Sequence, residues 1–468
     1  MALLGGNKSD SEHDEIQLFY GKGLSEQPLP RYEIPKDTMP AGAAYDFIMD
    51  ELRDEGSARQ NLATFVQTWM EPEAQQLIMN TLDKNAVDKS EYPQTAEIEE
   101  RCVNIIANLW HADQRDEFIG TSTVGSSEAC MLGGMAALFR WKKQARELGL
   151  DMSKRPNLII SSAYQVVWEK FGVYWDVELR EVPVTKDCLA LDPEKAIELI
   201  DDYTICVVGI MGLTYTGRYD DIKALDAAIT TYNETSKVKV YIHVDAASGG
   251  LYTPFMEPDL EWDFRLDNVK SINTSGHKYG LVYPGVGWVL WKDKTWLPEE
   301  LIFNVSYLGG DMPTMAINFS RPASLIVAQY YLFLRLGFEG FRQVHARTQK
   351  AAKYITKEIE KLDLFEVING ADQLPVIAWT LKEDPGVVWD LYDLSDFLRM
   401  RGWQVPAYPM PADLEKMVVL RAVIKGDFSY DSALLFVRDL KASIEKLNKS
   451  HIIPNANNHP KTSHGFTH

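Results

Sequence analysis

Short apolar runs bounded by polar turns recur along the first two thirds of the chain, and each has the length of a buried strand. They are NLII near residue 157, TICVVGI at 204–210, VKVYIHVD at 238–245, VKSI at 269–272 and GVGWVLW at 285–291. Helical patterns lie between several of these runs, as at 223–236, and a longer amphipathic pattern covers 93–112. This alternation predicts an α/β fold in which helices cover both faces of a mostly parallel sheet.

The pattern changes after a long apolar helix predicted at 324–337. From about residue 348 a helix, short strands and a further helix follow, which predicts a second, smaller α+β domain. A chain of 468 residues also exceeds the roughly 250–300 at which a single core stops growing. We therefore expect an N-terminal arm (1–59), a large domain (60–347), a small domain (348–453) and a mobile tail (454–468).

The charge and the apolar segments narrow the class of partner. The formal net charge is −19 without a basic block, which argues against nucleic acid or an anionic membrane surface as the partner. The longest uncharged stretch, 203–217, is too short to span a membrane. The start of the chain is too short in apolar residues for a signal peptide. Four scattered cysteines without a CxxC pair predict reduced thiols in the cytoplasm. The acidic charge makes a small molecule the expected partner.

Two polar residues follow or end predicted strands. Lys278 comes after VKSI through a turn-like NTSG, at the carboxyl edge of the sheet, where open α/β sheets bind ligands. Asp245 ends the strand 238–245, and alternation places it on the same face as Lys239, Tyr241 and His243. The small residues after Asp245 leave room for a flat ligand. Taken singly, Lys278 is also consistent with a solvated lysine and Asp245 with a turn or helix cap.

A third feature is the pair Ser126 and Ser127, which stand after a glycine at the start of a helical pattern. A helix N-terminus with hydroxyls suits a phosphate, although an ordinary N-cap has the same appearance. Together the three features match pyridoxal phosphate chemistry. The lysine forms an imine with the aldehyde, the acid keeps the pyridine nitrogen protonated, and the helix end holds the phosphate. No dinucleotide, Walker, HExxH, GxSxG or paired-cysteine motif occurs, so no metal is predicted.

Six segments carry a resemblance to a known family. They are NLATFVQTWMEPEA (61–74), DKSEYPQTAEIE (88–99), GTSTVGSSEACMLGG (120–134), HVDAASGG (243–250), SGHKYGLVYPGVGWVLW (275–291) and INFSRPA (317–323). Together they resemble the bacterial glutamate decarboxylases, above all those of lactic acid bacteria, over about residues 30–450. The resemblance implies the fold-type I architecture of pyridoxal-phosphate enzymes. That architecture has a seven-stranded, mostly parallel sheet in the large domain, a small C-terminal α+β domain and an N-terminal arm.

The resemblance also implies cofactor contacts at individual positions. Lys278 is similar to the Schiff-base lysine, Asp245 to the partner of the pyridinium nitrogen, and Ala247 to the small residue packed on the ring. Gln165 matches a ring-covering glutamine where related decarboxylases carry histidine, which argues against an aromatic substrate, and Thr214 resembles a residue near a cofactor oxygen. The implied phosphate contacts are Ser126, Ser127, His277 and, across a subunit boundary, Ser320.

For the substrate, the resemblance implies decarboxylation of L-glutamate to 4-aminobutanoate with consumption of one proton, in a role in acid resistance. The positions similar to substrate contacts are Thr64, Phe65, Asn85, Asp88 and Arg421. Two alternatives stay open. Another decarboxylase or carbon–carbon lyase would keep the cofactor residues without needing Thr64, Phe65 and Asn85, and a protein that binds the cofactor without catalysis would keep them too.

The ends of the chain and its assembly give further expectations. His464 and His468 are candidates for a pH-dependent lid of the kind found in some bacterial relatives, although a disordered end with incidental histidines explains them equally well. The basic, tryptophan-containing calmodulin segment of plant relatives is absent, so no calmodulin control is expected. Fold-type I sites are completed across a dimer, so the resemblance implies a homo-oligomer of at least two chains.

Overall fold

The computed structural model describes residues 32–36, 38–112, 119–305, 312–383 and 386–449. Its contacts divide the chain into two units, 1–57 and 58–468. In the described part of the first unit lies helix α2 (Ala41–Leu52), which has no buried residue. All elements below belong to the second unit. None of the described helices combines the length and the apolar character needed to cross a membrane.

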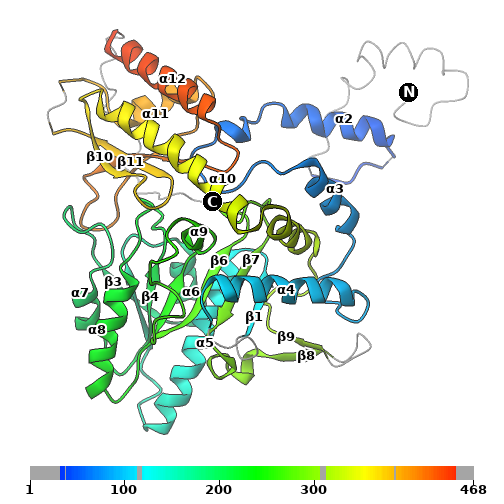
Figure 1. Cartoon of the computed structure of the whole chain (residues 1–468), viewed down its shortest axis with the longest axis vertical. Helices are drawn as coiled ribbons and strands as arrows, with labels where there is room; N and C mark the ends of the chain where they lie inside the picture. The colour runs from blue at the N-terminus through cyan, green and yellow to red at the C-terminus, as the bar shows by residue number, and fades with distance from the viewer. Residues whose placement is uncertain (1–31, 37, 113–118, 306–311, 384–385, 450–468) are drawn as a thin grey trace, which may run out of the picture. The chain divides into compact units, whose positions relative to one another are not determined.

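A seven-stranded sheet forms the centre of the second unit, in the order β1-β7-β6-β5-β4-β2-β3 (Figure 1). The strands are β1 (Ile119–Thr123), β2 (Asn157–Ser161), β3 (Glu178–Val182), β4 (Thr204–Ile210), β5 (Ile242–Asp245), β6 (Val269–Ser275) and β7 (Gly287–Trp291). The neighbours from β6 to β3 pair in parallel, whereas β7 runs antiparallel to both β6 and β1. The predicted seven-stranded, mostly parallel sheet is confirmed.

Helices cover both faces of this sheet. On one face α5 (Ser126–Glu147) and α6 (Val167–Trp175) pack on β2 and β4 in one apolar cluster. On the other face α4 (Pro93–Leu109), α8 (Ile222–Thr235) and α10 (Ser324–Glu360) pack on β5 and β6 in a second cluster. The shorter helices are α3 (Pro72–Thr81), α7 (Pro193–Glu198) and α9 (Thr253–Met256), with 3₁₀ turns at Ala58–Gln60, Gly249–Leu251, Lys294–Trp296 and Glu299–Leu301.

Three strands differ from the pattern-based expectation. The run predicted to be a strand from 238 pairs with its neighbours β4 and β6 only from Ile242 onward. Strand β1 was not predicted because its Gly-Thr-Ser-Thr residues are buried without being apolar. Strand β3 was missed because it is the edge strand, where three of its five residues are charged and only one is buried.

A second, antiparallel sheet has the order β10-β11-β13-β12. Its strands are β10 (Phe365–Gly370), β11 (Val376–Leu381), β12 (Ala407–Pro409) and β13 (Val418–Val423). Helices α11 (Leu391–Arg399), α12 (Tyr430–Lys449) and the second half of α10 share its apolar core. A small hairpin, β8 (Phe303–Val305) with β9 (Met312–Thr314), lies elsewhere in the chain. The predicted C-terminal α+β region is confirmed. The boundary at 347/348 stays a prediction, since α10 runs across it.

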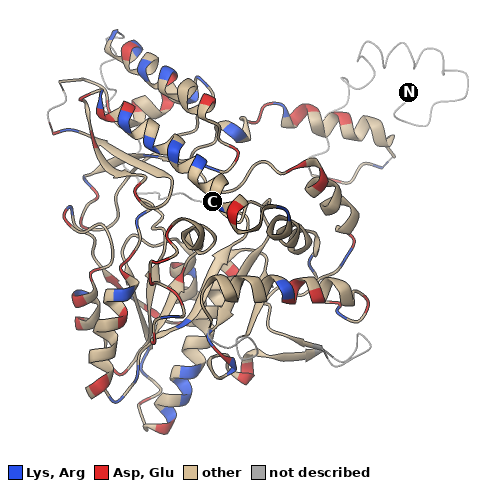
Figure 2. Ribbon diagram, in the orientation of Figure 1, with Lys and Arg blue, Asp and Glu red and all other residues tan. Residues whose placement is uncertain are grey.

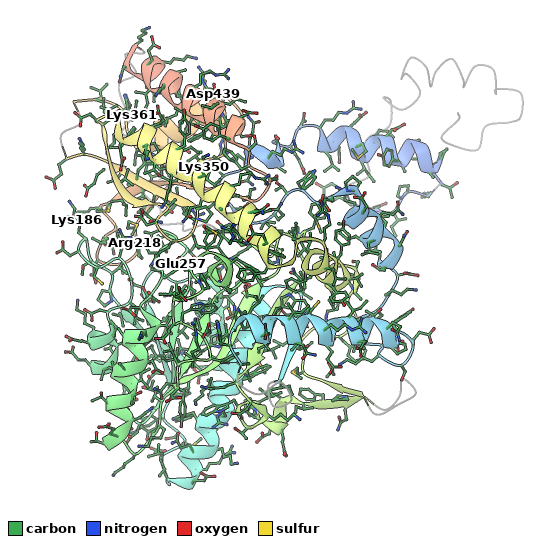
Figure 3. All side chains as sticks on the ribbon, viewed as in Figure 1. Lys186, Arg218, Glu257, Lys350, Lys361 and Asp439 are labelled. Carbon is green, nitrogen blue, oxygen red and sulfur yellow. The ribbon has the colours of Figure 1, made fainter. Side chains whose placement is uncertain are left out.

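Polar contacts join the two sheets. Arg218, in the loop after β4, donates from Nη2 to the carbonyl oxygen of Ile368 on β10 at 2.8 Å. Lys186 lies 3.8 Å from Glu366 on the same strand, and Figure 3 labels both Lys186 and Arg218. The small sheet is therefore fixed against the loops that leave the large sheet.

Helix α10 is interrupted at Gly337, whose φ of 57° lies in the left-handed region that favours glycine.

The buried His345 of α10 makes the stability of this unit depend on pH. Its Nε2 lies 2.9 Å from the carbonyl oxygen of Leu251, and its ring is surrounded by aromatic rings such as Tyr252 and Phe341. Burial lowers the pKa of His345 to about 3. The unfolded chain therefore binds one proton more than the folded chain between that value and the ordinary pKa of about 6.5.

We expect His345→Gln to flatten the acid dependence of stability. In the wild type this residue lowers the free energy of unfolding by about 1.4 kcal/mol for each pH unit below 6.5, and the variant lacks that slope. Urea unfolding of both proteins at pH 7, 6, 5 and 4.5 measures the difference. The destabilisation caused by the substitution should shrink as the pH falls, and parallel curves would contradict the assignment.

Candidate active site

Lys278 lies three residues beyond the end of β6, at the carboxyl edge of the large sheet. Its Nζ donates to Ser248 Oγ at 3.2 Å, and the side chain is partly exposed. Burial lowers the pKa of Lys278, while the charge of Asp245 acts in the opposite direction. An amine with a lowered pKa is more often neutral, and the neutral form is the nucleophile.

Asp245 is the last residue of β5 and is 4% exposed. One carboxylate oxygen, Oδ1, accepts hydrogen bonds at 3.1 Å from the backbone of Ala247 and from Asn273 Nδ2. The other, Oδ2, accepts a bond at 2.9 Å from Trp168 Nε1 on α6. Three hydrogen bonds, from the backbone of Ala247, from Asn273 on β6 and from Trp168 on α6, therefore fix the orientation of this buried carboxylate.

A chain of side-chain hydrogen bonds continues behind Asp245. His243 Nε2 lies 2.8 Å from Asn273 Oδ1, and its Nδ1 lies 2.7 Å from Ser271 Oγ. Since Asn273 donates to Asp245, its oxygen must accept from His243, which places a proton on Nε2. Burial lowers the pKa of His243 to about 4, so the ring is neutral near pH 7. The orientation of Asp245 thus depends directly on Asn273 and, through Asn273, on His243.

The N-terminus of α5 lies beside the turn before Lys278. Ser126 Oγ accepts a hydrogen bond from Ser275 Oγ at 2.7 Å, and no side chain caps the helix at Gly125. The first amides of a helix have no partner within it, so Ser126 and Ser127 begin an open anion site. His277 packs against Gly125 and donates from Nδ1 to Val286, and burial lowers the pKa of His277 to about 4.

Arg421 on β13 reaches the same place from the small sheet. It is 5% exposed, and its Nη atoms donate to the carbonyl oxygens of Thr214 and Ala63. The ring of Phe65 lies 5.1 Å from Lys278 Nζ and 5.2 Å from Arg421 Cζ. Among the described residues Arg421 has no carboxylate partner, and its buried Nε has no hydrogen bond. A buried cation in this state favours an anionic ligand.

A different group of predicted residues lies around Arg321. Asn85 Oδ1 accepts from the backbone of Arg321 at 3.2 Å, and the exposed Ser320 precedes it. Asp88 accepts from the backbone of Glu91 at 3.3 Å within its own loop. No hydrogen bond or ion pair between described residues joins Asn85, Asp88 or Ser320 to Lys278. The hydrogen bonds of the chain therefore do not link these three residues to the Lys278 group.

Three further predictions have simpler surroundings, and two fall outside the described residues. The Gln165 side chain accepts from the backbone of Val167 at 2.7 Å, at the start of α6. Thr64 precedes Phe65 and is partly exposed, as is Ala247, which lies between Asp245 and Ser248. His464 and His468 lie in 450–468, which the structure does not describe.

The comparisons with known proteins identify the family. Residues 35–382 match the pyridoxal-dependent decarboxylase conserved domain. The chain belongs to the pyridoxal-dependent decarboxylase family. It is 58% identical to a glutamate decarboxylase of Lactococcus lactis over 467 residues, which is 100% of both chains. It is 56% identical to glutamate decarboxylase beta of Listeria innocua, over 98% of this chain and 99% of the other.

A solved glutamate decarboxylase of Lactobacillus brevis has the same fold as this decarboxylase. The TM-score is 0.90 at 55% identity, over 92% of this chain and 98% of the other. The cofactor of the family is pyridoxal 5′-phosphate, and the residues present fit it. The helix end at Ser126 suits its phosphate, Asp245 offers a buried carboxylate, and Lys278 offers an amine whose pKa burial lowers.

Sequence reasoning missed several residues at this decarboxylase site. Asn273 and Ser275 lie on one face of β6, and the period of two along that strand was a usable signal. Trp168 had no signal, because only the packing of α6 against β5 brings its indole to Asp245. Cys130 of α5 is buried nearby, and burial, followed by the charge of Asp245, raises the pKa of its thiol well above the usual range.

Proposed function

We propose that this chain is a glutamate decarboxylase, which converts L-glutamate to 4-aminobutanoate and carbon dioxide and takes up one proton. The observation that carries the proposal is its identity to curated glutamate decarboxylases over their full lengths. The buried, unpaired Arg421 beside Lys278 supports an anionic substrate, as glutamate is. Gln165, where related decarboxylases carry histidine, argues against an aromatic substrate.

Pyridoxal phosphate, when bound, supplies a conjugated ring that accepts the electron pair left when carbon dioxide departs. The protein holds this ring from several sides. Asp245 keeps a proton on the ring nitrogen, because a fixed, buried carboxylate favours the positive partner. Ala247 and Gln165 cover the two faces of the ring, and Thr214 lies near a ring oxygen. The phosphate is held by Ser126, Ser127, His277 and, from a second chain, Ser320.

Lys278 has two tasks in this proposal. Its amine would hold the cofactor covalently between turnovers, and the lowered pKa favours the neutral form that this needs. It recovers the cofactor when the product leaves. His277 bonds to Val286 through Nδ1, so its bond to phosphate needs a second proton on the ring, which the phosphate charge would stabilise.

The substrate contacts decide which bond breaks. The bond to the departing carboxylate must stand perpendicular to the cofactor ring, since only then do its electrons overlap the conjugated system. Arg421 binds a substrate carboxylate, and Phe65 packs against the substrate while shielding the site from water. The distal carboxylate is held by Thr64, Asn85 and Asp88. Geometry at these contacts selects decarboxylation over the other reactions open to the cofactor.

A dimer accounts for the lack of any hydrogen bond between Asn85, Asp88 or Ser320 and Lys278 of the same chain. They form a neighbouring group around Arg321, and Ser320 is exposed. We infer that this group completes the site of a second copy. Separate mutant chains offer the test: mixing a Lys278→Ala chain with a Ser320→Ala chain should restore part of the activity that each lacks, as one site in the mixed dimer is intact.

We place the reaction in the cytoplasm and assign it a role in acid resistance. The four cysteines are free, and Cys102, Cys130 and Cys206 are buried, as expected of a chain kept in a reducing compartment. Each turnover removes one proton from solution, so a cell that exports the product raises its internal pH. The chain offers no calmodulin-binding segment of the plant type, and we propose no calmodulin partner.

The substrate assignment has a direct test. The cofactor-loaded enzyme is incubated in weakly acidic buffer with glutamate, aspartate, tyrosine or 3,4-dihydroxyphenylalanine, and the amine products are separated. We expect 4-aminobutanoate from glutamate and no amine from the others. An aromatic amine would show that the assignments of Thr64, Asn85 and Gln165 are wrong. A cofactor-bound protein that yields no amine at all would show binding without catalysis.

A further inference from the structure

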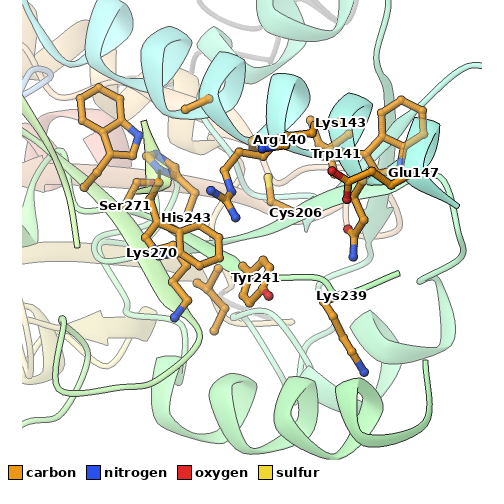
Figure 4. Close-up of a pocket in the computed structure, with 17 residues that line it drawn as sticks. Arg140, Trp141, Lys143, Glu147, Cys206, Lys239, Tyr241, His243, Lys270 and Ser271 are labelled. Carbon is orange, nitrogen blue, oxygen red and sulfur yellow. Dashed lines mark hydrogen bonds between the residues drawn. The ribbon is translucent and has the colours of Figure 1, made fainter. Parts of the chain in front are cut away.

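A cavity lies beside the C-terminal half of α5, away from Lys278. Its volume is about 330 Å³, and it is shown in Figure 4. The second half of α5 forms one wall, and the beginnings of β4, β5 and β6 form the other. In parallel strands these beginnings lie at the amino edge of the sheet, whereas Asp245 and Lys278 lie at the carboxyl edge. The cavity thus opens at the opposite edge of the sheet from Lys278, although His243 and Ser271, which line it, also belong to the hydrogen-bond chain behind Asp245.

The cavity carries an excess of positive charge. Its lining includes one carboxylate, Glu147, against four cations, which are Arg140, Lys143, Lys239 and Lys270. Figure 2 shows basic residues gathered along the second half of α5. None of the four cations forms an ion pair with a described residue. Two of them donate to backbone carbonyl oxygens instead, Lys239 to Asn233 and Ser236 and Arg140 to Thr295.

Arg140 and Lys270 share one aromatic ring. Arg140 Cζ lies 3.6 Å from the centre of Trp296, and Lys270 Nζ lies 4.7 Å from the same centre. Burial lowers the pKa of both, and each lies near enough to Asp293 for that charge to oppose the shift. Among the described residues no ion pair joins Asp293 to either cation, and Asp293 Oδ1 accepts a hydrogen bond from the backbone N–H of Thr295. Two partly desolvated cations therefore face one space without a bound counterion.

The cavity also has flat apolar walls. Trp291 lines it and is 1% exposed, and its Nε1 has no hydrogen-bond partner among the described residues. The indole rings of Trp141 and Trp296 and the small side chains of Ala136 and Ala137 provide apolar surface. The cations suit the acidic end of a ligand, and the aromatic walls suit a flat body.

We propose that this cavity is a second ligand site, which binds a small organic acid with a flat apolar body. Arg140 and Lys270 bind the anionic group, and the tryptophan rings contact the flat body. The volume lies at the low end of the range of small-molecule sites, so the ligand has the size of one or two fused rings. Neither the cofactor nor glutamate has a role here, and the proposal stands whatever the substrate of the decarboxylase is.

Calorimetric titration of the cofactor-loaded enzyme with 2-naphthoate tests the proposal. The matched neutral probe is 2-naphthamide, which has the same shape without the charge. We expect one naphthoate to bind per chain and the amide to bind at least about tenfold more weakly, as one charge-assisted contact is lost. Equal binding of the two probes, or no heat from naphthoate up to its solubility limit, would overturn the proposal.

Substitutions locate the bound probe. Lys270→Gln should weaken naphthoate binding at least about tenfold, and Lys143→Gln, at the exposed mouth, up to about threefold. Lys142→Gln is the matched control, since Lys142 lies on the same helix outside the cavity and should leave binding unchanged. Naphthoate that still binds fully to the Lys270→Gln and Lys143→Gln proteins, or that inhibits competitively against glutamate at its dissociation constant, lies elsewhere and contradicts the proposal.

Discussion

Lys278→Ala is expected to lower the rate of 4-aminobutanoate formation by a factor of at least about 10³. The substitution removes the only amine that lies beside Asp245, Phe65 and Arg421 in the described site, and loss of the covalent catalytic group is among the largest single-residue effects in enzymes. Steady-state assays with saturating glutamate and cofactor measure it. The visible absorbance that the enzyme-bound cofactor owes to this lysine should be lost as well.

Lys278→Arg separates the amine from its charge. Arginine keeps a cation next to Phe65 but stays protonated, so it has no free electron pair to react. We expect this variant to be as inactive as the alanine variant while it keeps the far-ultraviolet circular dichroism of the wild type. Near-normal activity in either variant would show that another residue binds the cofactor.

Asp245→Asn is expected to lower kcat at least about 10²-fold, which is the size typical of losing one positioned charge or proton partner. Asparagine has almost the same shape, so the fold should persist. It has no charge with which to keep the ring nitrogen protonated, and its amide cannot accept at both positions that Trp168 and Asn273 now bind. The bound cofactor should also dissociate faster in dilution experiments.

A smaller effect is expected from Trp168→Phe, which removes one of the three hydrogen-bond donors to Asp245. We expect a roughly fivefold fall in kcat, since one neutral hydrogen bond is worth about 1 kcal/mol. Trp175→Phe on the same helix is the control, because Trp175 Nε1 has no hydrogen-bond partner among the described residues. Equal losses in the two tryptophan variants would point to helix packing rather than to the orientation of Asp245.

The sequence by itself predicted the sheet and the places of Asp245, Lys278, Ser126 and Ser127 on it. These positions follow from local rules. A strand that ends in a turn delivers its last polar residue to the carboxyl edge, and a helix that begins with serines leaves its amides open there. Alternation along β5 likewise placed His243 on the face of Asp245, and the hydrogen bonds through Asn273 agree with that placement.

The tertiary structure decided which distant residues share the site. Arg421 reaches Phe65 only because β13 packs against the loops of the large sheet, and Trp168 reaches Asp245 only because α6 packs on β4 and β5. It also created the cationic cavity under α5, which is lined by residues of α5, β4, β5, β6, β7 and the 3₁₀ turn Lys294–Trp296. Periodicity describes how one segment is buried, but contacts between segments depend on packing that no single segment contains.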